Sequence, residues 1–232
     1  MSNTVVHADS HSDAHAAHHP ALQHHFDTMG QQKEAAVIGM WVFLLTEILF
    51  FGGLFMAYML YRTWYFDAFA EASRSLSLFW GGLNTAVLIG SSLTMAMAVR
   101  SAQTNQRKAT VNWLILTTVL GCVFLGVKVI EYADKFEHHI VPGPHFDKSA
   151  WTHPAGVEQF YSLYFIMTGL HAVHMVIGIG LMTVIAIMAW RRQFDGVYYT
   201  PVEVSGLYWH FVDIVWIFLF PLLYLIGRHY HA

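Results

Sequence analysis

The chain has 232 residues, of which 56% are hydrophobic, 16% aromatic and only 12% charged. Side chains of this kind cannot give a domain of this size a solvated surface, so the composition excludes an ordinary water-soluble globular protein. The net charge of -3 at pH 7 also argues against a nucleic-acid partner.

The first 34 residues are polar, rich in histidine and poor in side chains that a core would bury. We expect them to form a disordered cytoplasmic tail. No regular ligand spacing or cysteine accompanies the seven histidines of this tail, so we assign it no metal site. Because the tail lacks the short apolar core of a secretory signal, we expect the first membrane span to direct insertion itself.

Five apolar segments follow, and each is about as long as the roughly 20 residues that a helix needs to cross the hydrocarbon core. We therefore predict an all-α fold, an integral membrane bundle of five transmembrane helices within a single domain at 35–232. The predicted spans are 35–61, 79–99, 111–130, 160–190 and 206–227.

The orientation of the bundle follows from its lysines and arginines, which are enriched in cytoplasmic loops. We predict a cytoplasmic N-terminus, because that orientation places the larger number of these residues inside. The inner segments then hold Lys33, Arg100, Arg107, Lys108, Arg191 and Arg192, and the outer segments hold Arg62, Arg74, Lys135, Lys148 and Arg228.

Ionisable residues interrupt three of the spans. A charged side chain at the centre of a membrane helix costs about 2.5 to 3.5 kcal/mol on insertion scales, so such residues usually face protein or a functional cavity. Glu47 lies in the first span, His171 and His174 in the fourth, and His210 and Asp213 in the fifth. We take these five as the candidate functional residues.

The histidines do not have the arrangement of a haem site. Two histidines three residues apart on one helix cannot bind opposite faces of a haem, and only His210 remains as a further ligand well inside a span. A copper or zinc site made by His171, His174 and His210 is sterically possible. A lone histidine on a helix is more often hydrogen-bonded across the bundle, so we predict no metal or other cofactor site in this chain.

Other pairs have structural interpretations. His210 and Asp213 are three residues apart, as are Lys128 and Glu131, so each pair shares a helix face and can neutralise its own charge. Arg191 and Arg192 follow the fourth span, where they either contact lipid phosphates or anchor the helix end.

Small side chains recur every fourth residue along the second span, at Gly82, Ala86, Gly90 and Thr94. Such a stripe lets a neighbouring helix backbone approach closely. We therefore predict that this face packs against another helix.

Five motifs together carry a family resemblance. They are TEILFF around Glu47, LNTAVLIGSS in the second span, EYADK after the third, GLHAVHMVIG in the fourth and YWHFVDIVWIFLF in the fifth. Their order and identity over 35–227 resemble subunit III of the haem–copper terminal oxidases, in its short bacterial form with five helices.

The resemblance implies an accessory subunit in the bacterial cytoplasmic membrane. Its expected protein partners are subunit I, subunit II and other subunits of the respiratory complex. Subunit I is the catalytic subunit and holds the haems and copper. Structural phospholipids are expected in a cleft. Glu47 matches the buried carboxylate that carbodiimides modify in the family. The subunit supports proton uptake, lipid and oxygen access, and the durability of the catalytic subunit, whereas His171, His174, His210 and Asp213 match signature positions without a catalytic role.

Two other functions stay open at this point. The chain is also compatible with the equivalent subunit of a quinol oxidase or a nitric oxide reductase. A proton-coupled transporter would use Glu47, His210 and Asp213 as a relay. Against that alternative, the sequence has no apparent inverted repeat and no matched pair of broken helices.

Overall fold

A computed structural model describes residues 20–144, 146–194 and 198–228. In this part of the chain it contains six α-helices, a short 3-10 helix and no strand. Five helices are long and apolar enough to cross a membrane, which confirms the predicted bundle. The elements are α1 (Met29–Trp64), α2 (Phe66–Arg74), α3 (Leu78–Gln103), α4 (Arg107–Glu137), α5 (Pro154–Trp190), α6 (Thr200–Tyr224) and the 3-10 helix Ile226–Arg228.

Helix α1 begins six residues before the predicted start of the first span. Thr28 is its N-cap, and the Thr28 hydroxyl accepts a hydrogen bond from the backbone N–H of Gln31 at 3.2 Å. The Gln31 side chain in turn accepts one from the backbone N–H of Asp27. The Thr28 hydroxyl thus satisfies a free N–H group of the first helical turn, and this cap accounts for the earlier start.

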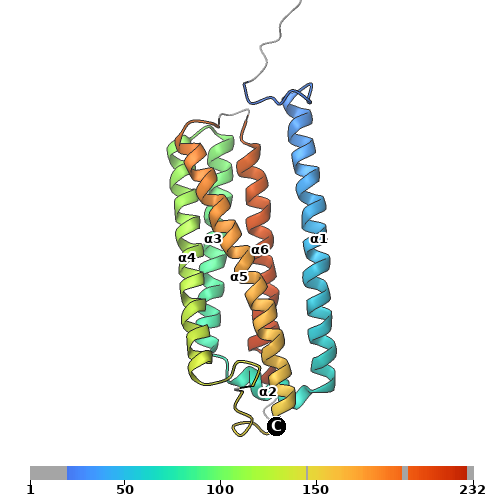
Figure 1. Cartoon of the computed structure of the whole chain (residues 1–232). Coiled ribbons are helices and arrows are strands. Elements are labelled where there is room, and N and C mark those ends of the chain that lie inside the picture. The colour runs from blue at the N-terminus through green and yellow to red at the C-terminus, as the bar shows by residue number, and fades with distance from the viewer. Residues whose placement is uncertain (1–19, 145, 195–197, 229–232) are drawn as a thin grey trace, which may run out of the picture.

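Helices α3, α4, α5 and α6 pack together, and α1 stands beside them (Figure 1). The only buried residues of α1 are Leu44, Phe51 and Tyr58, which are seven residues apart and therefore lie on one face. Large aromatic side chains such as Trp209 and Trp216 fill the interior of the other four helices. Helix α1 thus contacts the bundle along a narrow stripe, and most of its surface faces outward.

Two polar contacts hold α1 to α6 near its ends. Lys33 and Glu203 form an ion pair, with 2.8 Å between Lys33 Nζ and Glu203 Oε2, at the end where α1 begins. At the other end, the Tyr58 hydroxyl donates a hydrogen bond to the carbonyl oxygen of Leu222 at 2.8 Å. These contacts fix the position of α1 where its apolar contact is sparse.

Helix α2, which the sequence pattern did not predict, lies at the end of the bundle opposite the start of α1 (Figure 1). Ala68 and Phe69 of α2 are buried. Gly156 of α5 fits against it so closely that an added Cβ would lie 2.5 Å from the Ala68 Cβ. With nine residues α2 is too short to span a membrane, and for that reason a search for long apolar segments does not find it.

The predicted small-residue stripe on α3 is wrong at its two glycines, although Thr94 is buried and its hydroxyl lies 2.7 Å from that of Thr117 on α4. A Cβ added at Gly82 or Gly90 would meet nothing within 4 Å, whereas one at Gly81 would lie 2.8 Å from the ring of Phe220. A shift of one residue rotates the helix face by about 100°, so the periodicity alone does not define which face packs. Trp209 fits closely into the bundle interior, because its ring lies against both Gly121 of α4 and Gly178 of α5.

This fit predicts that Gly121→Ala destabilises the bundle, since its Cβ would lie 2.7 Å from Trp209 Cη2. Overpacking of a core typically costs about 1 to 3 kcal/mol. Gly90→Ala is the matched control, because it has the same gain in helix propensity and open space around it. In thermal unfolding of the purified protein, we expect a clearly lower melting temperature for Gly121→Ala than for Gly90→Ala. Equal shifts would contradict the packing described here.

Candidate functional site

The carboxylate of Glu47 meets a histidine of another helix. Glu47 lies near the middle of α1, and its Oε2 is 3.1 Å from Nε2 of His174 on α5. The side chains of Glu47 and His174 are 19% and 14% exposed, so both are largely covered by the protein. The structure therefore brings together two of the five candidate residues, although 127 positions separate them in the sequence.

The hydrogen bonds of His174 determine how many protons this pair holds. Nδ1 of His174 lies 2.9 Å from the carbonyl oxygen of Leu170, which can only accept, so Nδ1 carries a proton. The contact between Nε2 and Glu47 needs one further proton, located either on the carboxyl group or on the imidazole. Both arrangements have zero net charge, so the pair can hold a proton inside the membrane without an isolated charge.

The surroundings of the pair are aromatic. The ring of Phe51 lies edge-on to the His174 ring, with 5.3 Å between the centroids. The hydroxyl of Tyr208 on α6 donates to the backbone carbonyl oxygen of His174 at 3.0 Å, which ties this turn of α5 to α6. Apolar surroundings strengthen a hydrogen bond and also make an unpaired polar group costly, so the Glu47–His174 contact is well defined.

His171 points elsewhere, into the interior formed by α3 to α6. It is almost completely buried between the rings of Phe124 and Trp216, with centroid distances of 5.5 and 5.3 Å. Neither ring nitrogen has a hydrogen-bond partner among the described residues. In the same part of the chain, no three His, Cys, Asp or Glu side chains come together, so His171, His174 and His210 do not form a shared ligand set.

The predicted pairing of His210 with Asp213 is wrong. Nδ1 of His210 instead lies 2.8 Å from the hydroxyl of Ser92 on α3. Asp213 is buried, and neither of its oxygens makes a hydrogen bond within the described residues. The two side chains share a helix face, but α3 supplies the closer partner for His210. A direct relay through Glu47, His210 and Asp213 is therefore not assembled.

The predicted pairing of Lys128 with Glu131 is confirmed, with 2.8 Å between Nζ and Oε2. The pair is buried in the protein, because its side chains are only 5% and 4% exposed. Lys128 also donates to the Tyr224 hydroxyl at 2.8 Å, and Glu131 Oε1 accepts from Tyr164 at 3.1 Å. The sequence analysis missed both tyrosines, which provide the additional hydrogen bonds that a buried ion pair needs.

The two arginines after α5 have different neighbours. Both are exposed, and Arg192 has a positive φ of 59°. Arg192 lines a surface hollow together with Arg107 and Lys108 at the start of α4, whereas Arg191 does not line it. A basic cluster thus forms at the end of the bundle where α4 begins, and Arg107 and Lys108 belong to it in addition to the predicted Arg192.

Comparison with known proteins gives a consistent result. The family model for cytochrome c oxidase subunit III matches residues 18–228. Cytochrome c oxidase subunit 3 of Thermostichus vulcanus is 32% identical over 206 residues, which cover 87% of this chain and 92% of the relative. Cytochrome c oxidase subunit 3 of Synechocystis sp. is 30% identical, covering 97% and 88%. Quinol oxidase subunit 3 of Bacillus subtilis is 32% identical, covering 82% and 87%.

The geometry predicts selective labelling of Glu47 by a hydrophobic carbodiimide, which attacks protonated carboxyl groups from the membrane. Glu47 is partly accessible and shares a proton with His174, whereas Glu131 is buried against Lys128. In native membranes we expect mass spectrometry to locate the label on Glu47 and not on Glu131. Glu47→Gln should abolish labelling of this chain. Labelling that spares Glu47 and spreads over Glu137 and Glu158 would contradict the proton-sharing pair.

Proposed function

The chain belongs to the cytochrome c oxidase subunit III family, and on this premise we propose that it is a non-catalytic membrane subunit of a proton-pumping haem–copper terminal oxidase. The family match over 18–228 and the five membrane-spanning helices support this proposal. Oxygen reduction then takes place on another subunit. This chain supports that chemistry by helping to supply protons, by binding lipid and by stabilising the catalytic subunit.

We assign the haems and copper to the catalytic subunit I, with subunit II and further respiratory subunits as partners. This assignment rests on the membership of the chain in the subunit III family. We place the chain in the bacterial cytoplasmic membrane with its N-terminus inside, in agreement with the distribution of lysine and arginine. Phospholipids complete the proposed assembly, with Arg191 and Arg192 as candidate contacts to their phosphates.

The observation that carries the proposed role in proton uptake is the hydrogen bond between Glu47 and His174. The proton shared by Glu47 and His174 can lie on either group without giving the pair a net charge, so the pair can receive and pass on a proton by exchange. Its partial exposure leaves a route for that exchange. We infer that the pair acts as a proton-holding station beside the catalytic subunit, where it eases the supply of protons during turnover.

The electron donor is either cytochrome c or a quinol. The Bacillus subtilis relative is a quinol oxidase subunit and is as similar in sequence as the Thermostichus vulcanus cytochrome c oxidase subunit. Purification of the complex and identification of its subunits would decide between the two, because a copper-binding subunit II accepts electrons from cytochrome c.

Loss of this chain should shorten the working life of the oxidase rather than abolish its chemistry. We expect a complex depleted of the chain to begin oxygen consumption at a substantial rate and to lose activity over successive turnovers. The decay should be faster at higher pH, since protons are then scarcer and their supply limits turnover. Oxygen consumption at several pH values measures this. Immediate and complete loss of activity in a haem-loaded complex would show that the chain supplies a catalytic element.

A variant of the intact complex separates the role of the Glu47 proton from the structural effect of removing the whole chain. Glu47→Gln keeps the shape of the side chain but removes its acid group, so we expect the same pH-dependent decay with all subunits present. Glu34→Gln is the control, because Glu34 lies on the same helix and is exposed near its start. Identical behaviour of the two variants would contradict the role of Glu47.

A further inference from the structure

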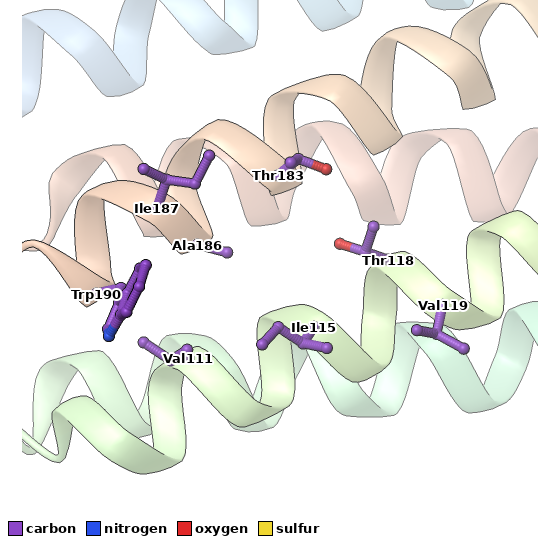
Figure 2. Close-up of a pocket in the computed structure, with 8 residues that line it drawn as sticks. All are labelled: Val111, Ile115, Thr118, Val119, Thr183, Ala186, Ile187 and Trp190. Carbon is purple, nitrogen blue, oxygen red and sulfur yellow. The ribbon is translucent and has the colours of Figure 1, made fainter.

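An apolar groove runs between α4 and α5 at the end of the bundle where α4 begins. Its volume is about 470 Å³. Figure 2 shows its two walls, with Val111, Ile115 and Thr118 on α4 facing Trp190, Ala186 and Thr183 on α5. From Val111 to Val119 the groove extends roughly 12 Å along the helix axis.

Small side chains leave this groove open, and its walls have few polar groups that are available to a ligand. Ala186 and the two threonines leave space where larger residues would close the contact between α4 and α5. The Thr118 hydroxyl donates to the carbonyl oxygen of Leu114 at 2.9 Å, and that of Thr183 to Ile179 at 2.7 Å. Because both hydroxyl protons are used within their own helices, the groove favours a hydrocarbon chain.

The mouth of the groove is basic. Arg107 donates to the carbonyl oxygen of Ala189 at 3.2 Å and also to that of Trp190, a residue of the groove wall. Beyond Arg107 is a second hollow, lined by Gln106, Arg107, Lys108, Ala109 and Arg192. The hollow of basic residues therefore adjoins the apolar groove at Arg107.

Lys108 and Arg192 are the cations of this mouth that face outward. Both are exposed, and within the described residues neither forms an ion pair with an acid. The nearest acidic residue in the sequence is Asp195, which lies outside the described residues. An anion at this mouth would thus meet two cations and the partly engaged guanidinium of Arg107.

We propose that the groove and its mouth together bind one anionic phospholipid. Its acyl chain lies between α4 and α5, and its phosphate contacts Lys108 and Arg192. This deepens the proposed lipid role and rests on the proposed function for the position of the chain in the membrane. It replaces Arg191 by Lys108 as the partner of Arg192. Trp190 beside the mouth fits the enrichment of tryptophan at the membrane–water boundary.

The test uses the intact oxidase complex in lipid nanodiscs, with spin-labelled phosphatidylglycerol and phosphatidylcholine as probes. Electron spin resonance gives the relative affinity of the complex for each lipid. The double variant Lys108→Gln with Arg192→Gln removes the proposed phosphate contacts, and Ala186→Phe fills the groove. The controls are Arg62→Gln with Lys148→Gln, which removes two cations elsewhere, and Ala96→Phe, which enlarges an exposed side chain on α3.

We expect the unchanged complex to prefer phosphatidylglycerol. The double variant should lower that preference by up to roughly 5-fold for each cation removed. Ala186→Phe should reduce the motionally restricted fraction of phosphatidylglycerol, and both controls should bind lipid like the unchanged complex. Equal affinity for both lipids, or equal effects of variants and controls, would overturn the proposal. So would displacement of the lipid by millimolar inorganic phosphate, because the groove would then contribute nothing.

Co-purification of subunit I from the same preparations keeps the two proposals apart. A complex that assembles normally but has no lipid preference contradicts only the lipid site. A chain that never co-purifies with a haem-bearing subunit contradicts the proposed function itself.

Discussion

A polar group inside a membrane is stabilised by a partner within the protein, and this constraint shapes the two buried pairs of ionisable side chains in the bundle, whereas His171 and Asp213 are buried without a hydrogen-bond partner among the described residues. Glu47 meets His174, and Lys128 meets Glu131 and Tyr224. Glu47 and His174 come from different helices, as do Lys128 and Tyr224, so each of these two contacts also fixes one helix against another. The contacts that balance charge in this bundle therefore also hold its helices together.

The position of α1 connects this constraint with function. Helix α1 has a single buried stripe against the other helices, so its polar contacts near both ends and at Glu47 determine how it is held. The central contact is also the one that can exchange a proton. Movement of the proton shared by Glu47 and His174 therefore acts directly on α1, the helix whose largely exposed surface is available to a partner subunit.

The spans could be predicted from the sequence because a long apolar segment is what a membrane-crossing helix requires. Glu47 could be predicted as a functional residue because a carboxylate in the middle of such a segment is energetically unfavourable without a partner. The sequence did not indicate which of the membrane histidines is the partner of Glu47. The neighbours of His171, His174 and His210 depend on helix rotation, which an almost uniformly apolar sequence does not encode. For the same reason the sequence pattern indicated Gly82 where Gly81 makes the contact, and it did not indicate Tyr164 and Tyr224 beside Lys128. The nine residues of α2 carry no membrane-length signal at all.

The central claim is that Glu47 shares one proton with His174. Infrared difference spectroscopy of the intact complex, with Glu47→Gln used to identify the Glu47 band, tests it most directly. The account predicts that His174→Phe shifts this band, because the carboxyl group loses its partner and must keep the proton alone. His171→Phe should leave it unchanged, since His171 lies in the interior of the other four helices. A Glu47 band that is indifferent to residue 174 would contradict the account.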